Sequence, residues 1–236
     1  MSITASSIAK APAGGPVPET LLDADVVLVQ FDDFWGEAIQ TATQQPGEGP
    51  TFAGHCEVVV RESGKPPLSV GATTTVTKIR PLASLLARPC VLAVVRYRPF
   101  LAPQRSVIAS KARSYVGRVY GYPKLAAHFG DALISRLFRR DVYFFRWLCR
   151  MDTYPICSWE VAFSYDAVGY QFGVRPNAAQ PDDVADHAMG EAGWELVWLS
   201  SERARAEFLA AFIGRAQPAK GRPGQRIVVD GVPFLS

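Results

Sequence analysis

Residues 51–79 read as strand, turn and strand: TFAGHCEVVVR (Thr51–Arg61), ESGKPP (Glu62–Pro67) and LSVGATTTVTKI (Leu68–Ile79). Both outer runs are rich in β-branched residues, and Gly and Pro fill the segment between them. Further strands are predicted over Asp25–Asp32, Cys90–Tyr97 and Val107–Tyr115. Five strands with little helix between them indicate an antiparallel sheet or partial barrel over residues 25–130 of an α+β protein.

A basic amphipathic helix is predicted over residues 131–152, after the break at Gly121–Pro123. At 3.6 residues per turn, the large apolar side chains fall on about half of its circumference. The opposite side carries five arginines: Arg136, Arg139, Arg140, Arg146 and Arg150.

The last quarter of the chain is predicted to form a separate βαββ domain over residues 153–216. Cys157–Tyr165 (CSWEVAFSY) alternates like a strand, and Pro181 opens a helix that Gly193 closes. Gly193–Leu199 and Glu207–Gly214 supply the last two strands. Residues 1–24 are expected to be a disordered or extended arm, and residues 217–236 an extended tail.

The stretch Gly190–Val197 (GEAGWELV) gives the first of two resemblances to known families. It resembles the helix-to-strand junction of a small bacterial βαββ domain of unknown function, whose signature is GxEGWELV. The resemblance covers roughly Pro155–Ala216 and implies a fold without an activity.

The stretch Gly117–Phe129 (GRVYGYPKLAAHF) gives the second resemblance. It is similar to the active-site stretch of the acetoacetate decarboxylase superfamily, approximately GRExxGYPKKLAxF. The resemblance implies a Schiff-base enzyme in which Lys124 is the nucleophile and Arg118 belongs to the site. The acid expected after Arg118 is Val119 here, and the second lysine is Leu125.

The charge distribution favours a partner-binding function. The net charge is +3, but Lys111–Arg150 holds nine basic residues against two acidic ones, a local charge of +7 that leaves −4 elsewhere. We expect a non-catalytic accessory or scaffold subunit of a larger assembly that docks through the five arginines. The alternative partners are RNA or another polyanion, an anionic lipid surface, and acidic protein subunits. The alternative function is the Lys124 enzyme.

Motifs for other chemistry are weak or missing. His55 and Cys56 are neighbours that could begin a metal site, but no second pair with ligand spacing follows, so no metal and no cofactor are expected. No GxSxG motif, GxGxxG motif, P-loop or reactive-cysteine signature occurs.

The four cysteines lack a regular framework, which favours buried thiols in a reducing intracellular compartment. The run Met1–Glu19 has no acid before Glu19. That composition leaves open a disordered tail or an organelle transit sequence, for instance a mitochondrial one. No apolar run is long enough for a membrane span.

Overall fold

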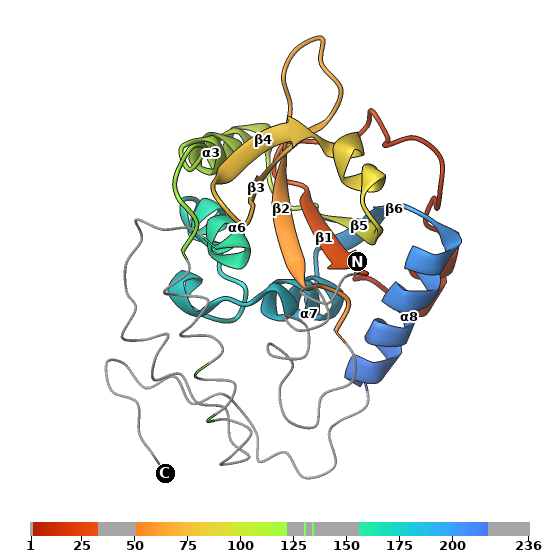
Figure 1. Ribbon diagram of the computed structural model, residues 1–236. Coiled ribbons are helices and arrows are strands. Elements are labelled where there is room, and N and C mark those ends of the chain that lie inside the picture. Colours follow the sequence, from red (N-terminus) through yellow and green to blue (C-terminus); the bar gives the residue numbers. More distant parts are fainter. Residues whose placement is uncertain (1, 33–50, 122–129, 131–133, 135–155, 217–236) are drawn as a thin grey trace.

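The computed structural model describes residues 2–32, 51–121, 130, 134 and 156–216. Within these residues the fold is α+β, with one open antiparallel sheet in the order β4-β3-β2-β1-β5-β6 (Figure 1). The strands are β1 (Val26–Phe31), β2 (His55–Val60), β3 (Leu68–Ala72), β4 (Thr77–Pro81), β5 (Cys90–Tyr97) and β6 (Trp194–Leu199). The helices are α1 (Ala5–Lys10), α3 (Ala102–Arg113), α6 (Cys157–Asp166), α7 (Pro181–Gly190) and α8 (Glu202–Ala216), with short 3₁₀ turns η1 (Leu82–Ala87) and η2 (Pro176–Ala178).

Most of the predicted strands are confirmed, and one of them is divided. Residues 68–79 form two strands because Thr73 closes a turn: its hydroxyl donates to the carbonyl oxygen of Val76 at 2.7 Å. The main chain then returns as β4, antiparallel to β3.

Three predicted strands are helices, so the separate βαββ domain is wrong. The segment 157–216 runs helix, helix, strand, helix, and its strand β6 is the edge of the common sheet beside β5. The predicted strand 107–115 lies mostly in α3, whose buried positions Arg105, Ile108, Ala109 and Ala112 recur at helical spacing. The predicted strand 207–214 lies in α8, where Ala204, Phe208 and Ala211 are buried at the same spacing.

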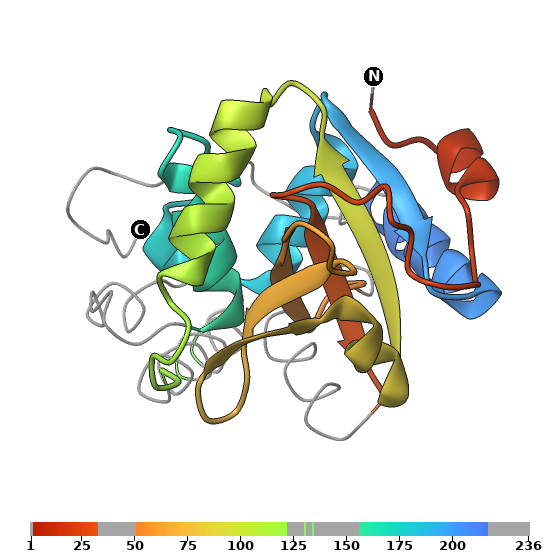
Figure 2. The same ribbon diagram turned by 90° about the horizontal axis from the view of Figure 1, so that it is seen from above.

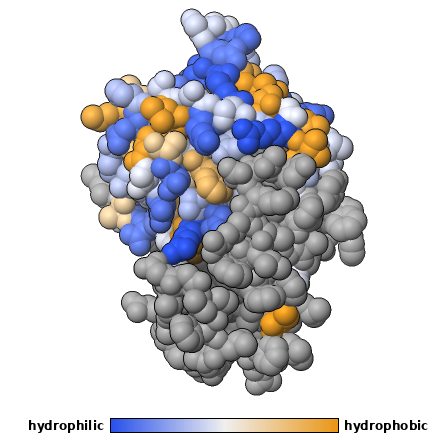
Figure 3. Space-filling model, turned by 90° about the vertical axis from the view of Figure 1, so that its left-hand side faces the viewer, coloured by the Kyte–Doolittle hydropathy of each residue, from blue (hydrophilic) through white to orange (hydrophobic). Residues whose placement is uncertain are grey.

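Two apolar clusters pack against the sheet, one on each of its faces. The larger cluster joins β1, β2 and β5 to residues of α3, α6, α7 and α8. The smaller cluster lies on the opposite face and includes Val27, Val59, Leu82 and Trp198. Figure 2 shows α3 and α6 side by side over the sheet. On the face drawn in Figure 3, hydrophilic and hydrophobic residues of the described part are interspersed.

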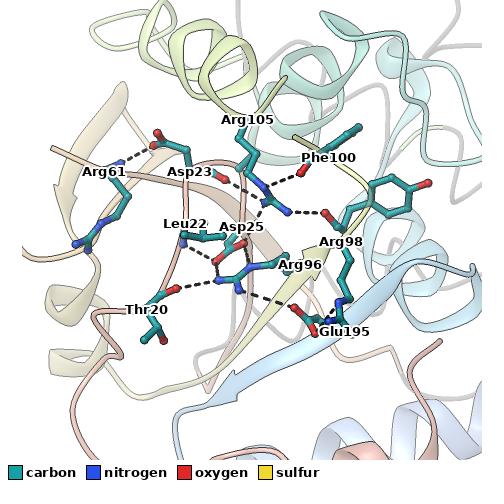
Figure 4. A network of polar contacts seen from close by, with 12 residues as sticks. Thr20, Leu22, Asp23, Asp25, Arg61, Arg96, Arg98, Phe100, Arg105 and Glu195 are labelled. Carbon is teal, nitrogen blue, oxygen red and sulfur yellow. Dashed lines mark hydrogen bonds and ion pairs between the residues drawn. The ribbon is translucent and has the colours of Figure 1, made fainter. Parts of the chain in front are cut away.

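A polar network fixes α3 to the sheet (Figure 4). Asp25 is fully buried and accepts two hydrogen bonds from Arg96, at 2.7 and 2.6 Å. Arg105 of α3 donates to the carbonyl oxygen of Tyr97 at 2.7 Å and lies 3.6 Å from the Asp25 carboxylate. The buried charges are therefore paired within the chain, as stability requires.

Gly193 is a position where only glycine fits. It has φ +95°, and a Cβ there would lie 2.7 Å from Cε2 of Tyr97. Gly193→Val should therefore lower the free energy of unfolding in urea by more than about 1 kcal/mol. Gly64→Val is the matched control, because Gly64 also has positive φ (+72°) but open space around it. An equal or smaller loss at Gly193 than at Gly64 would contradict the steric part of this prediction.

Candidate active site

Cys157 is the first residue of α6, and that position gives its thiol unusual surroundings. Ile156 is the N-cap, so the first-turn N–H groups lie next to Cys157 without helical acceptors. The helix dipole and these N–H groups favour a negative charge at this end. Cys157 is 7% exposed, and α6 packs against the face of β2 that carries Cys56 and Val58.

His55 and Glu57 lie on the face of β2 opposite to Cys56 and Val58, because successive residues of a strand alternate between its faces. His55 is the first residue of the strand. The Nε2 atom of His55 lies 2.9 Å from Oε1 of Glu57. The His55 side chain also forms a hydrogen bond with that of Cys157. His55 therefore contacts both Glu57 and Cys157.

Glu57 is a buried carboxylate held by three elements. Ser69 of β3 donates to its Oε2 at 2.5 Å, and Arg80 of β4 donates to its Oε1. Burial acts to raise the pKa of Glu57, but the contacts with His55, Arg80 and Ser69 outweigh burial and lower it. Glu57 is therefore ionised and fixes the orientation of the His55 ring.

Cys157 and His55 each favour the charged form of the other. A hydrogen bond with the Cys56 side chain lowers the pKa of Cys157 well below its usual value, and attraction to His55 adds to this effect against the opposing effect of burial. Burial acts to lower the pKa of His55, but Cys157 and Glu57 outweigh it and raise the pKa to about 10. The two shifts together favour a thiolate and an imidazolium, the reactive form of a cysteine nucleophile.

Glu160, one turn further along α6, is a second buried acid beside the pair. It is 1% exposed, and its Oε2 accepts a hydrogen bond from Thr77 of β4 at 3.3 Å. Among the described residues its Oε1 has no hydrogen-bond partner. Burial and the negative charge of Glu57 raise its pKa well above the usual value. This shift favours the protonated, neutral form of Glu160.

Gly71 of β3 leaves the space that the Glu57 carboxyl occupies. A Cβ on Gly71 would lie 2.3 Å from Cδ of Glu57. Gly71→Ala should therefore cost about 1–3 kcal/mol of unfolding free energy, as overpacking of a fixed interior group does. The measurement is a double-mutant cycle in urea with Glu57→Ala, because shortening Glu57 removes the clash. Additive losses in the cycle would contradict this account.

Most of the candidates from the sequence lie outside the described residues. These are Lys124 and the five arginines Arg136, Arg139, Arg140, Arg146 and Arg150, so their predicted roles stay predictions. Arg118 is described: its guanidinium lies 4.8 Å from the ring centroid of Tyr115. His187 of α7 lies 3.0 Å from the hydroxyl of Tyr170, which also accepts a hydrogen bond from Trp194 at 2.7 Å.

The sequence interpretation did not associate His55 with Cys157. In the sequence, His55 and Cys56 form a pair of possible metal ligands, and the alternation after Cys157 predicts a strand. A helix starting at Cys157 would have indicated a low-pKa thiol, and the HxE spacing in His55–Glu57 a histidine with its carboxylate. Among the described residues, no group of three His, Cys, Asp or Glu side chains is arranged to hold a metal ion.

Comparisons with known proteins give little beyond this geometry. No family model and no curated protein matches the chain. One matching solved structure is that of the metalloprotein yiiX from Escherichia coli O157:H7, with 18% identity and a TM-score of 0.45, over 78% of this chain and 91% of that one. At that level the likeness carries over neither an activity nor a metal.

The two family resemblances drawn from the sequence are corrected. No family model supports either of them. The GEAGWELV stretch is the end of α7 and the start of β6, which joins the common sheet rather than a βαββ unit. Separately, none of the helices in the described residues has the length and apolarity to cross a membrane.

Proposed function

We propose that the protein is an acyl-transfer enzyme with a cysteine nucleophile, which cleaves an amide, ester or thioester. The observation that carries this proposal is the Cys157–His55–Glu57 arrangement, with His55 2.9 Å from Glu57 and Cys157 at the start of α6. A cysteine paired with a histidine that a third polar side chain orients is the arrangement of cysteine proteases.

In the first step, the Cys157 thiolate attacks the carbonyl carbon of the substrate and forms the C–S bond. The imidazolium of His55 gives its proton to the leaving amine, alcohol or thiol as the bond from the carbonyl carbon to that group breaks. The N–H groups of the first turn of α6 are suited to hold the developing oxyanion. Glu57 keeps the ring aligned throughout.

In the second step, neutral His55 takes a proton from water, and the resulting hydroxide attacks the thioester carbonyl. The C–S bond breaks, the acid leaves, and the thiolate–imidazolium pair is restored. Another nucleophile in place of water would give transfer instead of hydrolysis. The side chains present suffice for both steps.

Trapping of the acyl-enzyme tests the proposal. The reduced full-length protein is mixed with p-nitrophenyl acetate, quenched in acid within the first turnover, and digested for mass spectrometry. Acetyl should be found on the peptide containing Cys157 and should disappear from this peptide in Cys157→Ser protein treated alike. Acetyl on lysines or on Cys90 alone would refute the proposal.

The pH dependence of alkylation gives a second check. Because the pKa of Cys157 is lowered and that of His55 is raised to about 10, the rate with iodoacetamide should rise in two steps. The first rise reflects formation of the Cys157 thiolate, at a pH below the ordinary cysteine pKa. The second follows loss of the His55 proton, because a thiolate released from its imidazolium is more basic and more nucleophilic. A single rise at the ordinary cysteine pKa would contradict the ion pair.

The accessory function predicted from the arginine-rich segment stays a prediction. It depends on residues outside the described part of the chain, and a partner-binding surface is compatible with an enzyme. Acylation of Cys157 in the wild-type protein would exclude a purely non-catalytic accessory function, but not partner binding by an enzyme.

A further inference from the structure

A second cysteine lies beside the proposed nucleophile. Cys56 is fully buried on β2, and its side chain belongs to the same core cluster as Val161, Ala162 and Tyr165 of α6. Cys157 begins that helix, and the two thiol groups lie within hydrogen-bonding reach of each other. Neither is in a disulfide in this structure.

The two thiols differ in pKa, as expected of a pair in which one thiol is oxidised first and the other then forms the disulfide. Burial and the neighbouring negative charge raise the pKa of Cys56 well above its usual value, so Cys56 stays a thiol. The pKa of Cys157 is lowered, which favours its thiolate. An oxidant therefore reacts first at Cys157, and a resolving thiol is already in place.

We propose that Cys56 and Cys157 form a reversible oxidation site, in which a peroxide converts the two thiols into a disulfide and so blocks the nucleophile. The Cys157 thiolate attacks one peroxide oxygen, the O–O bond breaks, and the departing hydroxide is protonated to water. The Cys56 sulfur then attacks the Cys157 sulfenic acid, loses its proton, and the S–O bond breaks with release of a second water. Each sulfur is oxidised by one electron, and the peroxide is reduced by two.

The position of Cys56 explains why this partner is favoured. Cys90, at the start of β5, donates its thiol to the carbonyl oxygen of Leu85 at 3.3 Å. Cys90 is half-buried, and burial raises its pKa. The Cys90 thiol is therefore bonded to Leu85, whereas the Cys56 side chain faces α6. The effect on catalysis rests on the proposed function, but disulfide formation does not.

The test uses the reduced full-length protein and hydrogen peroxide. After peroxide treatment, free thiols are blocked with iodoacetamide, and the protein is digested without reductant for mass spectrometry. A Cys56–Cys157 linked peptide should appear, iodoacetamide labelling of Cys157 should be lost, and dithiothreitol should restore that labelling. Acetylation by p-nitrophenyl acetate is followed in parallel, so that failure of the enzyme proposal is seen separately from failure of the disulfide.

Two variants serve as controls. Cys56→Ser should abolish the linked peptide, and Cys157 should then be oxidised to sulfinic acid that dithiothreitol does not reverse. Cys90→Ser should leave both the linked peptide and its reversal unchanged. A linked peptide between Cys157 and Cys90 or Cys149, or sulfinic acid at Cys157 of the wild type without any linked peptide, would overturn the proposal.

Discussion

Replacing Cys157 with Ala should abolish acyl transfer, with a loss of about 10⁴-fold or more in kcat/KM on p-nitrophenyl acetate. The reason is that the nucleophile itself is removed, so neither His55 nor the first turn of α6 has a bound intermediate to act on. Steady-state rates of p-nitrophenol release, corrected for the spontaneous reaction, measure the effect.

The matched control is Cys90→Ala, which removes a half-buried cysteine that takes no part in the proposed chemistry. It should retain the wild-type rate. The Cys157→Ala protein should keep a cooperative thermal unfolding transition, because the substitution removes only one small group at the N-terminus of α6. Retention of more than about a tenth of the activity in the folded variant would exclude Cys157 as the nucleophile.

The strands were predictable because their sequences bury alternate or continuous β-branched residues within short segments. The helices α3, α6 and α8 were not, and α6 shows why. Eight of its ten residues are buried, among them Trp159, Val161 and Tyr165. A helix that is buried on nearly every side, with polar residues such as Glu160 among the buried ones, has no apolar stripe of helical period to detect. The alternation in CSWEVAFSY therefore imitates a strand.

The same error concealed the candidate site. A cysteine at the start of a strand has no special chemistry, whereas one at a helix N-terminus has a favourable field for its thiolate. The partner His55 is 102 residues earlier in the chain, and only the packing of α6 on β2 brings the two together. Spacing within the sequence cannot reveal a contact of that range. The HxE pattern of His55 and Glu57 is visible in the sequence, but strands commonly contain such pairs, so the pattern alone does not indicate a catalytic histidine.

His55→Gln should lower the rate of Cys157 alkylation by iodoacetamide at pH 6 by at least about tenfold. Without the imidazolium, the thiolate loses the attraction and the hydrogen bond of His55, while burial still opposes the charged form, so the pKa of Cys157 rises even though its hydrogen bond with Cys56 remains. The thiolate fraction then falls tenfold for each pKa unit above the pH, and the greater nucleophilicity of a more basic thiolate offsets less than half of this loss.

Labelling of the Cys157 peptide, followed by mass spectrometry over time, gives the rate. His187→Gln is the matched control, because His187 lies on α7 beside Tyr170 and should leave the rate unchanged. Denatured protein supplies the reference rate of an ordinary cysteine. Equal rates for wild type and His55→Gln at pH 6, with both proteins folded, would show that Cys157 is not activated by His55. The ionised pair would then be excluded, because the attraction of His55 is what favours the Cys157 thiolate in that pair.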